Sequence, residues 1–401
     1  MNSSTAARPR QYYLDWLRVL SIFLVFVYHT ARIFGGESFH VNNARSYAGV
    51  DSFTSILTIV GMPLLFLVAG ASAFLSLGKT APGRYMKERV LRLLVPFAAG
   101  LLTHIPILVY LERVNHGEFS GSLIDFLPHY FDGFYGFGGN FAWMGLHLWF
   151  LMMLFFYTLF ALPILVWLAR SRGAAVLDRV AGFLARPGAI YLAVLPVLLL
   201  AVTLDPATIG ISIFGGWNVF IYMLYFLYGA ILVGHDRLRQ SIERQRWVSL
   251  VAALVFLIAG LVLWVTRFNQ IYPVYPTADY VLQNSVRALA SWFGLLAIWG
   301  FSIRHLNFGT KSLYLANEAV LPFYVLHQTV LLIVGFYVIQ WSVPDALKFV
   351  VIFVVSLIII VGLYWFAIRP YNVMRFLFGM RPKRVIEPEP VSPTVGMAGH
   401  Q

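Results

Sequence analysis

Residues 14–30 read LDWLRVLSIFLVFVYHT, an apolar run that, with its flanks, is long enough to cross a membrane as one helix. A helix needs about 20 mostly apolar residues to span the hydrocarbon core of a bilayer. Comparable runs occur ten times, at residues 14–34, 52–78, 90–111, 147–169, 188–204, 217–234, 247–266, 282–303, 313–340 and 346–369. The runs are continuous and lack the alternation of a membrane barrel. The predicted fold is therefore an all-α polytopic bundle of about ten transmembrane helices.

Bulk composition leads to the same class of protein. Of the 401 residues 60% are hydrophobic and only 11% are charged, whereas soluble domains carry about 25% charged residues. The net charge of +12 is spread over short basic clusters between apolar runs, so we expect a lipid bilayer and no nucleic acid as partner. The chain contains no cysteine, which excludes a disulfide framework and a thiol nucleophile.

The positions of the basic residues predict the orientation of the bundle. Of the 29 Lys and Arg residues, all but six lie before the first run, in every second connection between runs, after the last run, or at the adjoining edges of these runs, and therefore on one side of the predicted membrane. The six exceptions are Arg32, Arg45, Arg113, Arg267, Arg287 and Lys348. By the positive-inside rule the crowded side is cytoplasmic, and both termini then lie in the cytoplasm.

The sequence predicts one transmembrane domain over residues 11–375, followed by a disordered cytoplasmic tail at residues 376–401. The end of this tail, VIEPEPVSPTVGMAGHQ, is rich in proline and polar residues, which is typical of disorder. On the predicted outer side, the connection at 112–146 contains HYFDGFYGFGGNFAWMG. Its flat aromatic faces suit either a sugar ligand or an interfacial aromatic belt, and composition does not decide between the two.

Ionisable residues inside the apolar runs are the strongest functional signal, because such groups are costly in lipid. The first run carries Asp15, Arg18 and His29, which share one helix face. Arg18 lies near the inner edge and His29 in the outer half, about 16 Å apart along the axis. A satisfied interhelical hydrogen bond is the structural alternative for His29.

Three further groups of polar residues occur at the ends or middle of other runs. Arg89 and Arg92 share a face at the cytoplasmic boundary and suit either phosphates or anionic lipid. The ninth run carries Glu318, Tyr324 and His327, with Pro322 predicted to kink or interrupt the helix. The partner of Glu318 is expected from the first or third helix. The segment HLWFL places His147 and Trp149 at the start of the fourth helix, and His147 at the depth of His29.

Familiar soluble-enzyme motifs do not occur. The chain has no P-loop, no GxSxG elbow and no HExxH helix, so a phosphate-loop ATPase, an α/β-hydrolase and a zinc protease are unsupported. We predict no metal site.

Taken together, these segments resemble the acyltransferase-3 family of multi-pass membrane O-acyltransferases. The resemblance rests on LDWLRVLSIFLVFVYHT (14–30), MPLLFLVAGASAFL (62–75), RVLRLLVPF (89–97), HLWFLMMLFFY (147–157) and NEAVLPFYVLHQT (317–329). The spacing of Arg18 and His29 and the Arg-x-x-Arg pair at 89–92 are its most specific parts. HVNNARS after the first run and NEAVLPFYVLHQ also resemble the branch that succinylates periplasmic glucans.

This resemblance implies a reaction and a location. Cytoplasmic acyl-CoA would be the donor co-substrate, with no permanently bound cofactor, and Arg89 and Arg92 would hold its phosphates. The acceptor would be a hydroxyl of an extracytoplasmic glucan or other envelope glycan. The location would be the plasma membrane, as a bacterial inner-membrane protein.

The same resemblance assigns roles to the polar residues of the runs. His29 would act as general base or transient acyl carrier, Arg18 and Asp15 would support it, and Glu318 would belong to the catalytic set. Four residues would bind substrate: Tyr324, His327, His147 and Trp149. The alternatives are a proton-coupled secondary transporter and an exporter of acylated products, although the sequence shows no inverted repeat.

Overall fold

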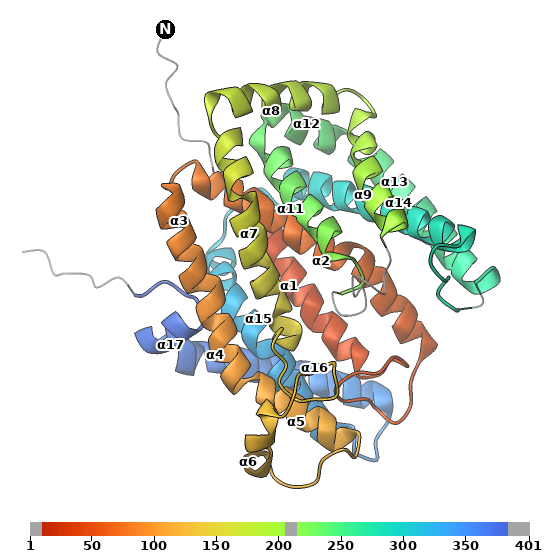
Figure 1. The fold of residues 1–401 in the computed structure, drawn as a ribbon, viewed down its shortest axis with the longest axis vertical. Coiled ribbons are helices and arrows are strands. Elements are labelled where there is room, and N and C mark those ends of the chain that lie inside the picture. Colours follow the sequence, from red (N-terminus) through yellow and green to blue (C-terminus); the bar gives the residue numbers. More distant parts are fainter. Residues whose placement is uncertain (1–9, 205–214, 269, 384–401) are drawn as a thin grey trace, which may run out of the picture.

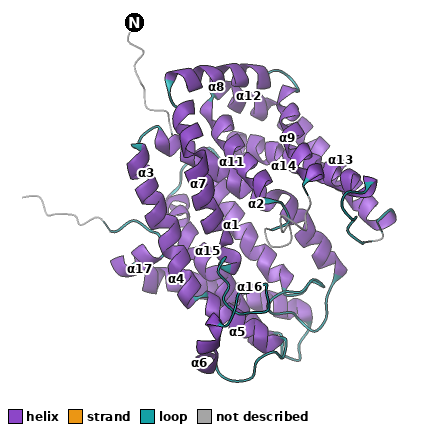
Figure 2. Ribbon diagram, in the orientation of Figure 1, coloured by secondary structure: helices purple, strands orange, loops and turns teal. Residues whose placement is uncertain are grey.

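A computed structural model describes residues 10–204, 215–268 and 270–383 of the chain. In these residues the chain is helical, and its single β-type pairing is an isolated bridge between Phe134 and Phe141. Figure 2 shows helices joined by loops throughout the described part. The all-α class predicted from the sequence is confirmed.

The elements follow the apolar runs closely. In chain order the larger helices are α1 (Tyr12–Arg32), α2 (Ala48–Leu77), α3 (Pro82–Arg89), α4 (Val95–Thr103), α5 (Ile105–Asn115), α7 (Trp149–Leu168), α8 (Ser171–Leu184), α9 (Val194–Thr203), α11 (Val219–Gly234), α12 (Asp236–Arg244), α13 (Arg246–Thr266), α14 (Ala278–His305), α15 (Lys311–Val338) and α16 (Asp345–Leu363). Short helices are η1 (Val90–Leu94), α6 (Leu123–Phe126), η2 (Pro128–Phe131), η3 (Leu146–Leu148), η4 (Ala189–Ala193), η5 (Tyr364–Ile368) and α17 (Asn372–Leu377).

Eight spans in the described residues are long and apolar enough to cross a membrane, and the number rises to ten if each of two bent helix pairs is one span. In these pairs α8 meets the η4–α9 segment at 118°, and α11 meets α12 at 102°. The apolar halves, α9 and α11, coincide with the predicted runs at 188–204 and 217–234. The basic connections beside them are therefore helices and not loops.

The bundle has two different ends. In Figure 1, α8 and α12 lie together across one end, while α5 and α6 lie at the opposite end. The long connections at residues 33–47 and 116–145 belong to this opposite end, which we call the loop end. Because α1 finishes at Arg32, directly before the first of these connections, His29 lies near the loop end.

The third span is bent by its own sequence. It runs from Pro82 to Asn115 as four consecutive helices, of which η1 is a single π-helical turn at Val90–Leu94. Pro96 has no N–H to offer to the carbonyl of Arg92, so the regular ladder cannot continue through this turn. Arg92 thus lies on a π-helical turn, a feature that is frequent at functional sites.

Close backbone contact between α2 and α11 builds the centre of the bundle. A Cβ atom on Gly70 would lie 1.8 Å from the carbonyl oxygen of Phe226, and one on Gly229 would lie 1.8 Å from that of Leu67. Small residues permit this approach, which is the common way for helices to associate in a membrane. Phe66, next to Leu67 on α2, packs on an aromatic group that includes Tyr222 at 4.8 Å between ring centroids.

Burial separates the helices that carry polar groups from those that face lipid. The most apolar windows of α14 and α15 are 67% and 61% buried, whereas that of α13 is only 11% buried. A helix that is apolar all round and this exposed needs lipid as its solvent. The buried helix α15 is the one that holds Glu318, Tyr324 and His327.

Two details differ from the sequence-based expectations. α15 is one continuous helix that contains Pro322, so the predicted interruption is wrong. The packing of this largely buried helix keeps it continuous despite the missing N–H. Of the tail predicted to be disordered, residues 384–401 lie outside the described residues. Residues 376–383 include the end of α17 and the buried side chains of Phe378 and Met380.

Candidate active site

Three histidines from three separate elements meet at the loop end of the bundle. His29 comes from α1, His327 from α15 and His147 from η3, immediately before α7. The ring centroid of His327 lies 5.2 Å from that of His29 and 5.2 Å from that of His147. The structure therefore brings together three residues that are far apart in the sequence.

Hydrogen bonds to backbone carbonyls hold two of these rings. Nδ1 of His327 donates to the carbonyl of Tyr324 at 2.5 Å, and Nε2 of His147 donates to the carbonyl of Val325 at 3.2 Å. The phenol of Tyr324 donates in turn to the carbonyl of His147. These contacts join α15 to the start of α7, so Tyr324 holds the cluster together from a buried position.

Three ring nitrogens of the cluster are buried and have no hydrogen-bond partner among the described residues. They are Nδ1 of His29, Nε2 of His327 and Nδ1 of His147. Buried polar atoms usually form hydrogen bonds, because each buried polar atom without one costs about 1–3 kcal/mol of free energy. Such a group of exceptions marks a site where something other than stability has shaped the structure.

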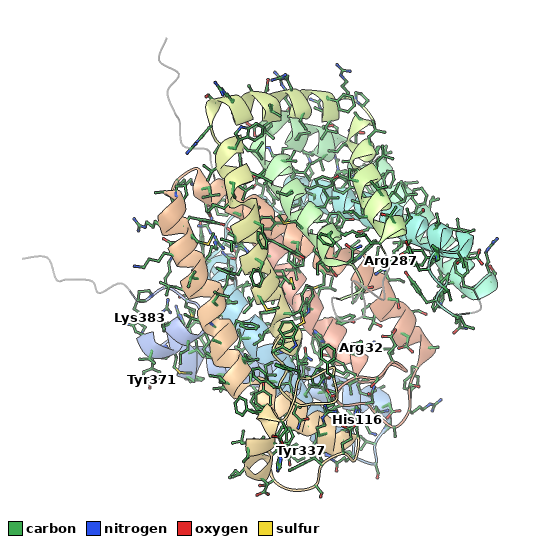
Figure 3. All side chains as sticks on the ribbon, in the orientation of Figure 1. Arg32, His116, Arg287, Tyr337, Tyr371 and Lys383 are labelled. Carbon is green, nitrogen blue, oxygen red and sulfur yellow. The ribbon has the colours of Figure 1, made fainter. Side chains whose placement is uncertain are left out.

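A cavity of about 1070 Å³ opens beside His29. His147, Trp149 and Gln328 also line it, whereas Tyr324 and His327 do not. Much of the remaining wall consists of methionine and aromatic side chains: Met62, Met144, Met152, Met153, Tyr28, Phe39, Trp143, Phe156 and Phe220. The cavity reaches the loop end, where Arg32, labelled in Figure 3, belongs to its wall.

The charged groups at the mouth of this cavity are paired with one another. Arg32 forms an ion pair with Glu37, and His40 contacts Glu112. Tyr135 donates to both carboxylate oxygens of Glu112 at 2.9 Å, and burial raises the pKa of its phenol so that it stays a donor. The mouth is therefore polar, and its charged side chains have partners within the protein.

Arg18 lies in a second polar cluster, nearer the other end of α1. Its guanidinium donates to Asp15 at 3.3 Å, to Asn317 at 2.9 Å and to Ser72 at 2.6 Å. Asp15 also binds Arg10 at 2.8 Å. The predicted contact between Asp15 and Arg18 is present, and it is extended to α2 and α15 by Ser72 and Asn317.

Arg89 and Arg92 remain near this cluster at the start of the third span. The guanidinium carbon of Arg89 lies 4.7 Å from the ring centroid of Tyr85. Arg92 donates from Nε to the carbonyl of Gly379 at 3.2 Å. Within the described part of the chain neither arginine forms an ion pair with a carboxylate, so both retain donors for an anion.

Glu318 is placed differently from the expectation. Its carboxylate binds Arg375 at 2.8 Å and Arg369 at 3.7 Å, so its partners come from the C-terminal segment and not from the first or third helix. Residues 318 and 327 are nine positions apart on α15, about 13 Å along the axis. Glu318 thus lines a separate cleft of about 560 Å³ with Trp365 and Lys383, away from the histidines.

Sequence reasoning missed several residues of the site. Ser72 is a small polar residue in the apolar run GASAF, and its polarity is the one sequence feature that could have pointed to it. The four methionines of the cavity wall carried a weak signal, since Met144, Met152 and Met153 are close in sequence. In the described residues no group of three or more His, Cys, Asp or Glu side chains is arranged to hold a metal ion.

Comparison with known proteins adds a family and relatives to this geometry. The family described as an acyltransferase domain matches residues 11–365. The proteins named Glucans biosynthesis protein C from Salmonella schwarzengrund and Salmonella heidelberg are each 24% identical to the chain over 398 residues. The alignments cover 94% of this chain and 97% of each relative. No solved structure matches.

Proposed function

The chain belongs to this acyltransferase family, and on that premise we propose that it moves an acyl group from cytoplasmic acyl-CoA to a hydroxyl of an extracytoplasmic glucan. Relatives whose name refers to glucan biosynthesis support the choice of acceptor. In this proposal the loop end faces outward and the protein lies in the plasma membrane of a bacterium.

The position of His29 is the observation that carries the proposal. Its ring lines a large cavity at the loop end, while Arg18 lies eleven residues earlier on the same helix, about 16 Å away along the axis. A donor entering from the opposite end would therefore meet arginines first and a histidine later. That order suits a molecule with phosphates at one end and a thioester at the other.

The reaction at His29 can be written with its protons balanced. An unprotonated ring nitrogen takes the proton of the acceptor hydroxyl while the oxygen attacks the thioester carbonyl carbon. The carbon–sulfur bond then breaks, and the leaving thiolate of CoA takes the proton from His29. In the alternative order the ring nitrogen attacks the thioester carbon and expels the CoA thiolate, so that the ring carries the acyl group. The acceptor hydroxyl then attacks the same carbon, the ring nitrogen leaves, and the hydroxyl proton passes to the thiolate. Both orders need the same free nitrogen.

The arginines would hold the donor by charge. Arg92 uses Nε for the carbonyl of Gly379, which leaves its two terminal nitrogens for phosphate oxygens. Arg89 is free of carboxylates among the described residues. Bidentate contacts between guanidinium and phosphate are strong and directional, so this pair suits the diphosphate of CoA.

The acceptor would enter from the loop end. Trp143 and Trp149 line the cavity, and the aromatic walls offer flat faces on which sugar rings pack. Arg32 is paired with Glu37, and the carboxylate of Glu112 contacts the ring of His40, so the charged groups of this entrance have partners within the protein. The paired rim favours a neutral acceptor over a highly charged one.

The decisive experiment replaces His29 in cells that lack the native gene. His29→Ala should abolish acylation of envelope glycans measured by mass spectrometry, with the protein present in the membrane at the parent level. His116→Ala is the matched control, because His116 is an exposed histidine at the loop end (Figure 3). Undiminished acylation by the His29 variant would overturn the assignment, and proton-driven flux without acylation would favour a transporter.

A further inference from the structure

His327 contacts the reactive ring but does not reach the cavity. Its side chain is 1% exposed, and it is missing from the lining that His29, His147 and Gln328 share. Its ring nevertheless lies 5.2 Å from that of His29, measured between centroids. Because His327 does not line the cavity, any part that it takes in a reaction there has to act through a neighbouring ring.

The proton on His327 is located by its neighbour. Nδ1 lies 2.5 Å from the carbonyl oxygen of Tyr324, and a carbonyl oxygen only accepts hydrogen bonds. Nδ1 must therefore carry the proton, and in the neutral ring Nε2 is left as an acceptor. That Nε2 is buried and has no partner among the described residues.

His29 has the opposite requirement. To act on a molecule in the cavity, either as a base or as an acyl carrier, it needs a free lone pair on the nitrogen that faces the cavity. The proton of the neutral ring must then lie on the other nitrogen. Nδ1 of His29 is the buried nitrogen without a partner, so a proton there needs an acceptor within the protein.

We propose that His327 is a positioning residue whose Nε2 accepts a hydrogen bond from Nδ1–H of His29 and so keeps Nε2 of His29 free for the reaction. A hydrogen bond between two imidazoles, with about 3 Å between nitrogens, places the ring centres about 5 Å apart. The observed separation of 5.2 Å between the ring centroids fits this distance. The proposed bond requires the His29 ring to turn until its Nδ1 faces Nε2 of His327, because neither nitrogen has a partner in the described structure. The other rings that contact His29 are those of Tyr28 and Phe39.

The pairing also matters during the reaction. When His29 takes a proton from the acceptor hydroxyl it becomes a cation, and its Nδ1–H then donates more strongly. No proton passes to His327, whose own Nδ1–H stays on the carbonyl of Tyr324. The proposal rests on the proposed function for its purpose, but the pairing itself can be observed without any acyl transfer.

The test reads the protonation of the His29 ring directly. The full-length protein, labelled with ¹⁵N-histidine and held in lipid nanodiscs, gives separate NMR shifts for protonated and unprotonated ring nitrogens. Loss of signals in His29→Gln assigns those of His29 among the ten histidines. We expect the proton on Nδ1 in the parent protein, and a shift of the proton towards Nε2 in His327→Leu.

Two further variants separate positioning from a general structural effect. His327→Gln keeps an acceptor oxygen and should keep the proton of His29 on Nδ1. His147→Gln changes the ring on the far side of His327 and should also leave the His29 tautomer unchanged. A proton on Nε2 of His29 in the parent, or an unchanged tautomer in a folded His327→Leu protein, would overturn the proposal.

Activity supplies the second readout, with acetyl-CoA and succinyl-CoA as donors and a β-glucan as acceptor. We expect His327→Leu to lower kcat by about tenfold to hundredfold with the donor KM unchanged, as befits one lost hydrogen bond to the reacting group. His327→Gln should recover most of the rate. A parent protein that shows the pairing but transfers no acyl group would overturn the proposed function and leave the pairing intact.

Discussion

The two polar clusters on α1 are built in opposite ways. Around His29 the polar atoms belong to imidazole rings, and three of their nitrogens have no partner in the described structure. Around Arg18 the donors are engaged, with hydrogen bonds to Asp15, Asn317 and Ser72 from three helices. One cluster leaves hydrogen-bonding capacity open, and the other uses it to join helices.

The difference indicates that the two clusters on α1 have different functions. An unpaired polar atom in an apolar bundle costs free energy, so it persists where function needs it. The saturated cluster fixes the packing of three helices beside Arg89 and Arg92, whose side chains form no ion pair with a carboxylate in the described structure. The His29 cluster should therefore govern the chemical step, and Arg89 and Arg92 the affinity for the donor.

The largest effect is expected at the unsaturated cluster. His29→Gln should lower kcat by about 10²–10⁴-fold while leaving the dissociation constant of CoA unchanged, because the variant removes acid–base chemistry and not phosphate contacts. Radiolabelled acyl transfer and CoA binding to the purified protein check both parts. If the variant loses CoA binding as severely as activity, His29 does not act in the chemical step alone, and the proposed difference between the clusters is wrong.

The second effect belongs to the arginines. Arg89→Gln combined with Arg92→Gln should raise the donor KM by about tenfold to hundredfold with a much smaller change in kcat, since hydrogen bonds to charged groups contribute about 1.5–3 kcal/mol each. Steady-state kinetics over a range of acyl-CoA concentrations separates the change in the donor KM from the change in kcat. Arg84→Gln is the control, because Arg84 is exposed and paired with Glu88 at 3.6 Å.

The third prediction concerns the ion pair by which Glu318 binds the C-terminal segment. Glu318→Gln leaves Arg375, whose side chain is only 8% exposed, without its carboxylate, and should lower the free energy of unfolding by about 1–3 kcal/mol. Thermal unfolding in detergent measures the loss. Glu243→Gln, which removes a surface pair with Arg304 at 3.8 Å, should change stability by less than about 0.5 kcal/mol. Equal stability of the two variants would contradict a structural role for Glu318.

The smallest effect is expected where the acceptor enters. Trp143→Ala should raise the glucan KM by about two- to tenfold, the size of one aromatic contact, with the donor KM unaffected. Trp341→Ala is matched in kind and exposure, 48% against 43%, but lies outside the cavity lining and should behave like the parent. Kinetics at varied glucan concentration measures the glucan KM of both variants. Equal effects of the two substitutions would show that Trp143 does not contact the acceptor.

Much of the fold could be predicted because hydropathy is a local property. The apolar runs coincide with the spans or with the apolar halves of the bent pairs. The basic connections after the fourth and sixth runs, by contrast, are the helices α8 and α12, which a membrane scale cannot distinguish from loops. The orientation of the bundle stays a prediction from the positive-inside rule.

For the site, the sequence by itself determined which residues are chemically unusual. An ionisable or polar side chain in lipid stands out without any knowledge of its neighbours, which is why His29, Arg18, His147 and His327 could be named from the chain alone. The contact between Asp15 and Arg18 also followed from spacing on one helix. Each of these inferences uses only residues that are close in sequence.

Only the tertiary structure decided which of these residues meet. Glu318 could have paired with several cations and is bound by Arg375, and His327 lies behind His29 instead of facing the cavity. Spacing along one helix says nothing about which face of another helix packs against it. Partners between helices depend on the packing of the whole bundle, as in the contact of Gly70 with α11, and this information is spread over the entire chain.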